Sequence, residues 1–544
     1  MNKKTLLAAL ILGGCATGSV SADAVKQGGT LNVPIITTSF VDNFNPYTSK
    51  DVFHGTMFEP LVVFNNMTGE THYRLAESLD VSDDLKTITL TLRDGLKWSD
   101  ENPLTSGDVA FSFELAKSNP AFDSKGVWSG GNLASIETPD ERTVVFKLNA
   151  PDSTFIWNLE KYHVLPKHIW EKVDNATTFT NPNPVGSGPM TTVKLLKPQQ
   201  MELCRNPHYY LEGRPYLDCV VFRSYNDNSQ IQPALIKGEI DWGSNFIADV
   251  ESTFVKRDPQ HNHFWYPAND AIHLYLNTQK APFNDVRVRQ ALSMALDREL
   301  IVDLAAYGYP TPNFNAGGIG DLYGQYINGD ITKQFEHLTS FDQDKANALL
   351  DEAGVVDKDG DGYRDLPDGS PFQFDISVVN GWTDWIQTIQ MVNELYDEIG
   401  VKSGLKTVDW SVYEKSLRQG TYDVAINWSM VATNPISAYQ EYYLSDRVGK
   451  GMHAGHGMNS AELDALINSF GQAGTEEEQQ AILNQLQTFT AENLPFIPLF
   501  SNPTWFQYRT KNIAGWPTEE NPYIQPVWYD GGKRVIILNN LHLR

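Results

Sequence analysis

Strand-like and helix-like patterns of apolar residues both occur in this chain. Residues 87–92 read Thr-Ile-Thr-Leu-Thr-Leu, and this alternation predicts a strand with one buried face, which Gly95 ends. A helix is predicted to begin at Thr105, because a Thr followed three positions later by an acid, here Asp108, satisfies the free N–H groups of a first helical turn. This part of the chain therefore combines a half-buried strand with a capped helix.

More elements of both kinds follow. Apolar residues form one stripe over 285–304, which predicts an amphipathic helix. A second helix is predicted over 342–353, and it stops at Gly354, a residue suited to the left-handed position after a helix. A third is predicted over 475–494, and the aromatic and β-branched stretch 496–508 suits a buried strand. This mixture predicts an α/β fold class with antiparallel additions.

Length and charge narrow the class of protein. A chain of 544 residues exceeds what one hydrophobic core normally serves, so two or three domains are expected. The chain has 42 Lys and Arg against 67 Asp and Glu, a net charge of −25. Phosphate neutralisation needs a basic face, so this balance argues against a nucleic-acid binder and against docking on an anionic membrane.

The first 22 residues resemble a secretory signal peptide. Two Lys precede the apolar run 5–12, and small residues at 20 and 22 suit a cleavage site. The run is too short to span a bilayer as a helix, so the signal 1–22 predicts a periplasmic protein. The alternative is a lipid anchor, because Leu-Gly-Gly-Cys at 12–15 also resembles a lipoprotein box that would leave lipid on Cys15.

Two cysteines remain after the signal, Cys204 and Cys219. The segments 201–204 and 219–222 read as strands, with turn residues between them. Antiparallel pairing would bring the two Cβ atoms within disulfide reach, in an oxidising compartment that permits the bond. A bridge closing so short a loop is worth about 3 kcal/mol in the chain-entropy model. The alternative is a pair of buried free thiols.

Enzyme chemistry finds little support. The chain has no G-x-S-x-G elbow, H-E-x-x-H motif, P-loop or dinucleotide fingerprint after a strand. His453 and His456 lie in a Gly-rich stretch and are interpreted as solvated loop residues, because two His alone do not make a metal site. A non-enzyme without a required cofactor is therefore expected.

One acidic segment, 357–368, matches an EF-hand-type loop. Such a loop places oxygen ligands for Ca²⁺ at fixed positions around a glycine. The matching residues here are Asp357, Asp359, Asp361, Tyr363 (through its carbonyl), Asp365 and Asp368. Two departures keep an ordinary Asp/Gly turn as the alternative: the last position is Asp instead of Glu, and the loop leads into a predicted strand over 372–379. An ion held here would be structural.

Several segments together resemble the family 5 solute-binding proteins of ABC importers. These proteins include dipeptide and oligopeptide binders and their sugar-binding relatives. The segments are Gly-Gly-Thr-Leu at 28–31, Leu-Arg-Asp-Gly-Leu-Lys-Trp-Ser-Asp at 92–100, Asn-Pro-Val-Gly-Ser-Gly-Pro at 183–189 and Pro-Phe-Asn-Asp-Val-Arg-Val-Arg-Gln-Ala-Leu at 282–292. Their order and spacing cover essentially the whole chain after the signal.

The resemblance implies a bilobal periplasmic binding protein, type II and cluster C, with an extra inserted domain. Lobe I would consist of 23–65, 190–276 and 501–544, the inserted subdomain of 66–189, and lobe II of 277–500. Ligand would bind between the lobes of a monomer, and an ABC permease would recognise the closed form. Differential binding to the open and closed forms would drive closure.

The ligand class depends on a few positions. Peptide binders of the family carry a Trp-x-x-Asp pattern whose Asp holds the ligand ammonium, whereas here Trp428 is followed by Val431 at the Asp position. A desolvated ammonium without a carboxylate partner is costly. A peptide ligand therefore loses its usual anchor, although peptide binding stays the alternative.

The sugar-binding branch matches better. Asn-Gly-Trp-Thr-Asp at 380–384, Asp-Trp-Gly-Ser-Asn-Phe at 241–246 and Gly-Trp at 515–516 look like segments of chitin-oligosaccharide binders, which also have a counterpart of the cysteine pair. The apolar face of a pyranose lies flat on indole, and its hydroxyls take hydrogen bonds from polar side chains. The resemblance implies these ligand contacts: Trp382, Asp384, Asn427, Trp516, Ser244 and Asn245.

The exact sugar stays open at this point. A chitin binder is expected to carry an aromatic residue near Ser429 or Met430, and neither is aromatic. A chito-oligosaccharide, a cello-oligosaccharide or another β-glucan fragment therefore fits the sequence equally well.

Overall fold

The computed structural model describes residues 25–544 except 38, 50–52, 124–125 and 433. The predicted signal peptide and Cys15 lie outside the described residues. Within them, no helix has the length and apolar character needed to cross a membrane.

Lobe I is built on a four-stranded sheet. Its order is β1-β10-β9-β8, with β1 parallel to β10 and the other pairs antiparallel. The strands are β1 (Thr30–Ile36), β10 (Cys219–Tyr225), β9 (Gln200–Arg205) and β8 (Met190–Lys197). Helices α4 (Asn228–Lys237), α5 (Val250–Thr253) and α15 (Gly531–Asn540) belong to the same lobe.

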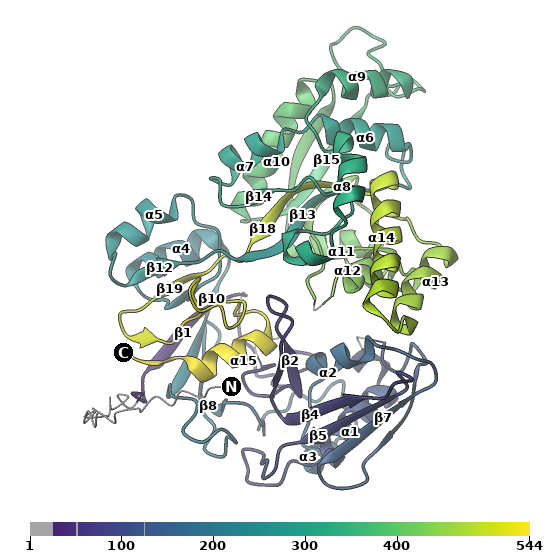
Figure 1. The fold of residues 1–544 in the computed structure, drawn as a ribbon. Coiled ribbons are helices and arrows are strands. Elements are labelled where there is room, and N and C mark those ends of the chain that lie inside the picture. Colours follow the sequence, from purple (N-terminus) through teal and green to yellow (C-terminus); the bar gives the residue numbers. More distant parts are fainter. Residues whose placement is uncertain (1–24, 38, 50–52, 124–125, 433) are drawn as a thin grey trace, which may run out of the picture.

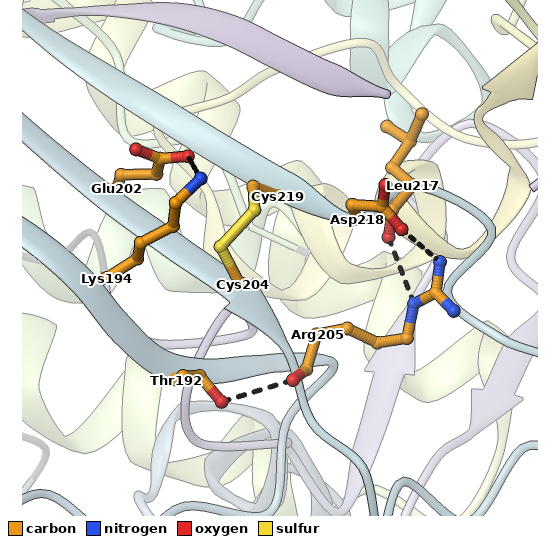
Figure 2. Close-up of a disulfide and its surroundings, with 8 residues drawn as sticks. All are labelled: Thr192, Lys194, Glu202, Cys204, Arg205, Leu217, Asp218 and Cys219. Atoms are coloured by element: carbon orange, nitrogen blue, oxygen red, sulfur yellow. Dashed lines mark hydrogen bonds and ion pairs between the residues drawn. A yellow bond between two sulfur atoms is a disulfide. The ribbon is translucent and has the colours of Figure 1, made fainter. Parts of the chain in front are cut away.

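The predicted disulfide is confirmed. Cys204 on β9 lies directly opposite Cys219 on β10, and the two sulfur atoms are bonded (Figure 2). The ion pair between Lys194 and Glu202 (2.8 Å) lies beside the bridge on the neighbouring strand pair. The disulfide therefore links two neighbouring strands covalently, and their antiparallel pairing agrees with the sequence pattern.

The inserted subdomain has its own antiparallel sheet, with the order β4-β5-β7-β6. It comprises β4 (Ala76–Val81), β5 (Thr87–Leu92), β6 (Leu133–Glu137), β7 (Thr143–Leu148), α1 (Ser106–Ser118), α2 (Asn158–Lys161) and α3 (Lys167–Trp170). The predicted strand 87–92 and the capping box of Thr105 and Asp108 are confirmed. A short hairpin, β2 (Val62–Phe64) and β3 (Thr71–Tyr73), leads into this subdomain.

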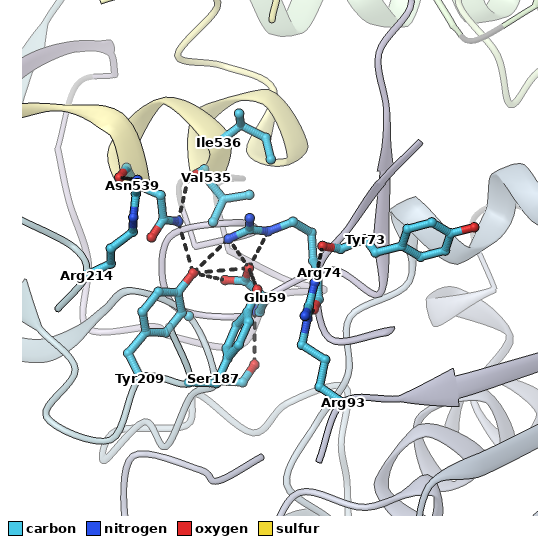
Figure 3. A network of polar contacts seen from close by, with 12 residues as sticks. Glu59, Tyr73, Arg74, Arg93, Ser187, Tyr209, Arg214, Val535, Ile536 and Asn539 are labelled. Carbon is cyan, nitrogen blue, oxygen red and sulfur yellow. Dashed lines mark hydrogen bonds and ion pairs between the residues drawn. The ribbon is translucent and has the colours of Figure 1, made fainter. Parts of the chain in front are cut away.

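A buried polar network joins the subdomain to lobe I (Figure 3). The guanidinium of Arg74 pairs with Glu59 at 2.7 Å, and the hydroxyls of Tyr209 and Tyr210 donate to the same carboxylate. Burial raises the pKa of Glu59, and the charge of Arg74 offsets part of that shift. Asn539 of α15 donates to Tyr209 at 3.0 Å. A buried pair bonded on all sides fixes geometry more than it adds stability.

Lobe II is built on a six-stranded sheet in the order β14-β18-β13-β17-β15-β16. The strands are β13 (Ala268–Leu276), β14 (Thr311–Pro312), β15 (Gln373–Val379), β16 (Lys402–Val408), β17 (Val424–Trp428) and β18 (Phe496–Pro503). The other helices of the lobe are α8 (Gly329–Phe335), α10 (Thr383–Asp397), α11 (Trp410–Gln419), α12 (Ile436–Tyr443) and α13 (Ala461–Ser469).

Two predicted helices of lobe II are confirmed, and a third prediction is corrected. α9 (Gln343–Glu352) ends before Gly354, and α14 (Glu476–Asn493) starts after its Thr475 cap. The single helix predicted over 285–304 is two, α6 (Val286–Met294) and α7 (Arg298–Ala305). Asp297 breaks it, because its carboxylate accepts the Leu300 N–H and starts a new helix.

The single strand predicted over 496–508 is also two strands, in different sheets. β18 ends at Pro503, and β19 (Gln507–Arg509) pairs with β11 (Trp242–Gly243) and β12 (Asn262–Phe264) of lobe I. The chain therefore crosses between the lobes at 503–507. It crosses a second time at 265–268, because β13 belongs to the lobe II sheet from Ala268 onward, nine residues before the predicted boundary at 277.

Candidate functional site

The carboxyl ends of four strands meet at one edge of the lobe II sheet. β16, β15, β17 and β18 run in one direction and β13 runs against them, so both crossovers leave from this edge. Gly381, just after β15, lies against lobe I, since a Cβ there would come within 2.7 Å of Asp227 Cβ. Ligands of open α/β sheets bind outside the carboxyl ends of the strands, and this edge is the candidate site.

A cluster of tryptophans covers this edge. Trp382 follows β15, Trp410 follows β16 and Trp428 ends β17. The ring centroids of Trp410 and Trp428 lie 6.1 Å apart at 9°, and Trp382 lies 5.8 Å from Trp410. Trp410 is 41% exposed, whereas Trp385 behind the cluster is 5% exposed. We call Trp382, Trp410 and Trp428 the tryptophan edge; it places partly exposed indole surface where the lobes meet.

Trp382 is predicted from the sequence, whereas Trp410 was missed and Trp428 was assigned only to a peptide pattern. A signal was present, because each indole follows or ends a strand of one parallel set. Parallel strands present their carboxyl ends at the same edge. Grouping the residues that follow each predicted strand therefore finds all three.

Asp384 lies on the first turn of α10, beside the tryptophan edge. Its side chain is almost fully buried and accepts the backbone N–H of Trp385. Burial raises the pKa of Asp384 to about 6. The structure therefore places two predicted contacts, Trp382 and Asp384, together.

A second carboxylate, Asp270, was not identified from the sequence. It lies at the start of β13, with 8% of its surface exposed. Burial raises its pKa to about 7, and the negative charge of Asp384 adds to the shift. Asn269 donates to Asp270 at 3.1 Å and hydrogen-bonds Tyr529 of lobe I. A polar Asn-Asp pair heading an apolar strand is the signal that could have revealed it.

Both carboxylates lack a cationic partner among the described residues. Within the described residues, no Lys or Arg forms an ion pair with Asp270 or with Asp384. Two nearby buried acids without a counter-charge are costly to ionise. The site can therefore supply hydrogen-bond acceptors to a polar ligand, and protonated carboxyl donors near neutral pH.

Asn427 lies behind this surface. It is fully buried on β17, its Nδ2 lies 3.4 Å from Nδ1 of His453, and its Oδ1 has no partner among the described residues. His453 and His456 are buried as well, which corrects their interpretation as solvated residues. Burial lowers their pKa values to about 4 and about 3, so both rings are neutral at pH 7.

Ser244 and Asn245 follow β11 in lobe I. Ser244 is half-buried, and Asn245 is 3% exposed. The Asn245 side chain donates to the Phe246 carbonyl (3.1 Å), while its backbone carbonyl accepts from Gln507 near the 503–507 crossover (3.0 Å). Ser244 is thus the more exposed of the two, and Asn245 contacts the crossover region.

Trp516 lies away from the tryptophan edge. It is 4% exposed, packs against Trp242 and Phe506, and its Nε1 donates to the carbonyls of Arg509 and Ile513. Its indole therefore belongs to the core of lobe I, and the structure does not bring it together with Trp382.

The acidic loop lies before β15, at the opposite end of that strand from Trp382. Carboxylate oxygens of Asp357, Asp359 and Asp361 gather within 4.8 Å of one another. Asp365 and Asp368 lie outside this converging group: Asp365 accepts the Lys358 N–H and Asp368 accepts from Ser370. The Tyr363 hydroxyl donates to Asp397, while the predicted ligand of that residue is its backbone carbonyl.

The sequence of this chain is similar to those of known binding proteins. A model of the bacterial extracellular solute-binding proteins, family 5 (middle region), matches residues 70–450. The oligopeptide-binding protein AppA of Bacillus subtilis (strain 168) is 28% identical over 511 residues, covering 91% of this chain and 90% of that protein. Heme-binding protein A of Haemophilus influenzae is 26% identical over 83% of each chain.

Two solved structures share the fold over nearly the whole chain. A periplasmic oligopeptide-binding protein of Thermotoga maritima with bound mannohexaose is 28% identical, with a TM-score of 0.84 over 95% of this chain and 98% of that one. AppA of Bacillus subtilis with a nonapeptide is 25% identical, with a TM-score of 0.79 over 96% and 100%. The predicted bilobal α/β fold is confirmed.

Proposed function

Because the chain belongs to the family 5 bacterial extracellular solute-binding proteins, we propose that it captures β-linked oligosaccharides between its two lobes. Members of the family are the binding components of ABC importers. The proposed ligands are chito- or cello-oligosaccharides, and the proposed partner is an ABC permease that recognises the closed monomer. Signal cleavage after residue 22 would release the protein into the periplasm; lipid on Cys15 is the alternative.

The tryptophan edge is the observation that carries this proposal. It presents partly exposed indoles from the ends of three strands. Their ring centroids lie 5.7–6.1 Å apart, which is about the length of one sugar unit. Indole faces bind the apolar faces of pyranoses, and a few placed polar groups fix the hydroxyls. Asp384 and Asp270 supply such groups beside it. A relative of similar fold holds mannohexaose, which supports an oligosaccharide ligand.

A thermal-shift screen tests the ligand class. Chitobiose, cellobiose, laminaribiose, mannobiose and a set of tripeptides are compared at equal concentrations. A ligand that binds only the folded state raises the melting temperature by mass action, so one or more β-linked disaccharides should raise it and tripeptides should not. Stabilisation by tripeptides alone would reject the proposal.

Peptide binding is the second candidate, and one observation favours it. Asp270 and Asp384 are buried carboxylates without a cationic partner in the described part of the chain, and the ammonium of a peptide would supply one. AppA, with a bound nonapeptide, shares the fold. The two candidates differ in pH dependence: an ammonium needs ionised carboxylates, so peptide affinity should fall steeply from pH 8 to pH 5, while the affinity for a neutral sugar should change little.

We also propose that Asp357, Asp359 and Asp361 hold a structural Ca²⁺. Their oxygens converge, and each accepts a backbone N–H from within the loop, which orients its carboxylate. Hard carboxylate oxygens suit this ion. The site lies at the far end of β15 from the tryptophan edge, so its role would be stability and not ligand choice.

A further inference from the structure

The inserted subdomain touches lobe II through a short loop before α2. The backbone N–H of Ser153 donates to the carbonyl of Gly471 at 2.8 Å. Nε2 of Gln479, on α14, donates to the Ser153 hydroxyl at 3.3 Å. This contact joins segments more than three hundred residues apart, and neither crossover passes through it.

Asp152 lies too close to Gly471 to leave room for a side chain at position 471. A Cβ there would lie 2.8 Å from Oδ1 of Asp152 and 3.6 Å from its Cα. Asp152 is held in place, because its N–H donates to the Leu85 carbonyl and its carboxylate accepts from Thr154. Glycine at 471 therefore allows the two backbones to meet.

Trp157 adds the apolar part of the contact. It is half-buried and packs against the core shared by lobe I and the inserted subdomain. It also packs against a separate core of lobe II that contains Phe470, the neighbour of Gly471. One indole therefore bridges two bodies that a lobe movement would separate.

This contact lies far from the two crossovers about which the lobes would rotate. Figure 1 shows the crossovers on the side of α4 and α5, and α13 and α14 on the opposite side, above the inserted subdomain. Rotation of lobe II about the crossovers moves the far side most. We infer that Ser153, Trp157 and Gly471 form a latch through which the inserted subdomain holds lobe II closed, so that these residues position the lobes for ligand capture.

The inference rests on the proposed function only in that a ligand is taken up by lobe closure. A ligand that binds the closed form gains whatever free energy the latch adds to closure. A net hydrogen bond and part of an indole contact are together worth on the order of a tenfold change in affinity. Breaking the latch should therefore weaken binding by about tenfold without touching the tryptophan edge.

Small-angle X-ray scattering on the full chain, without ligand, tests the latch directly. Gly471→Val inserts a wedge at the close approach, and Trp157→Ala removes the bridging indole. Gly474→Val is the matched control, because a Cβ there would come no closer than 3.8 Å to Glu478. Trp128→Ala is the control for the indole, since Trp128 packs within the shared core alone.

The latch predicts a larger radius of gyration for both test variants than for wild type and both controls, with cooperative melting retained. An unchanged radius in Gly471→Val and Trp157→Ala would overturn it. If Trp157→Ala fails to fold, Gly471→Val decides alone. Because no ligand is present, the scattering result is independent of the proposed function. If the test variants expand but the protein binds no sugar, the latch is supported and the proposed ligand is rejected. If the protein binds sugar but the test variants do not expand, the proposed ligand is supported and the latch is rejected.

Discussion

At the scale of single residues, Asp270 carries the most unusual electrostatics at the site. Burial holds its pKa at about 7, whereas an unfolded Asp titrates near 4. The folded protein therefore binds more protons than the unfolded chain between these values, and stability falls as pH rises from about 4 to about 7. Asp270→Asn should flatten this decline by up to about 1.4 kcal/mol per pH unit.

Chemical denaturation at several pH values measures the effect. Asp83→Asn, at an exposed position, is the matched control and should keep the wild-type slope. The assignment of Asp270 as a buried acid with a raised pKa is rejected if Asp270→Asn and wild type lose stability in parallel over this range.

The tryptophan edge makes a second prediction at this scale. Trp382→Ala should weaken sugar binding tenfold to a hundredfold, because losing a largely buried aromatic contact costs about 1.5–3 kcal/mol. Trp410→Ala should cost about tenfold or more, because the Trp410 ring is 41% exposed and has free area that a bound ligand would cover. Titration of intrinsic fluorescence measures both, with Trp128→Ala as the control. If both variants keep the wild-type affinity, the tryptophan edge does not contact the ligand.

Residue types at the site were only partly predictable. Trp382 and Asp384 stand in a recognisable segment, and the structure places them together. Trp516 stands in an equally recognisable segment, yet its indole is packed in a core with its N–H bonded to backbone carbonyls. Local sequence does not show which tryptophans are covered by other strands. Asp270 can be recognised as a site residue only once β13 is placed beside β17.

At the scale of elements, the disulfide ties β9 to β10. Denatured, unreduced protein should show no thiol from Cys204 or Cys219, and reduction should release both. The bridge spans 15 residues, a loop worth about 3 kcal/mol in the chain-entropy model, so reduction should lower the free energy of unfolding by about that amount. Two reactive thiols before reduction would disprove the bridge.

The acidic loop makes a prediction of its own. A bound ion at a hundred times its dissociation constant adds about 2.7 kcal/mol to stability, so EDTA should lower the melting temperature and Asp359→Ala should abolish that effect. Asp368→Ala is a sharp control, because Asp368 bonds Ser370 and lies outside the converging three. A melting temperature indifferent to chelator would leave the loop as an ordinary turn.

Elements were predicted well where local chemistry alone defines them. The Thr105 and Thr475 caps and the glycine after α9 are each set by a few neighbouring residues. Errors arose where a cap or a crossover interrupts a long apolar pattern. Asp297 caps a new helix through its carboxylate, and the next residue, Arg298, is buried against backbone carbonyls of Ser293 and Pro498. The hydrophobic stripe shows neither feature.

At the scale of the whole molecule, the bilobal fold followed from family segments spread along the chain, but the lobe boundary did not. β13 and β18 lie in lobe II, while the strands that flank them along the chain, β12 and β19, pair in lobe I. A continuous apolar stretch such as 496–508 hides the change of sheet. Only the long-range pairing shows that both crossovers leave from the edge that carries the tryptophans.

The proposed role of the whole molecule is to hold a β-linked oligosaccharide at this edge. Isothermal titration calorimetry of the purified protein against chitotriose, cellotriose and a tripeptide tests it most directly. At least one trisaccharide should bind saturably and one-to-one, about tenfold or more weaker in Trp382→Ala, and the tripeptide should give no heat. Saturable tripeptide binding, lost from pH 8 to pH 5 and unaffected by Trp382→Ala, would contradict it.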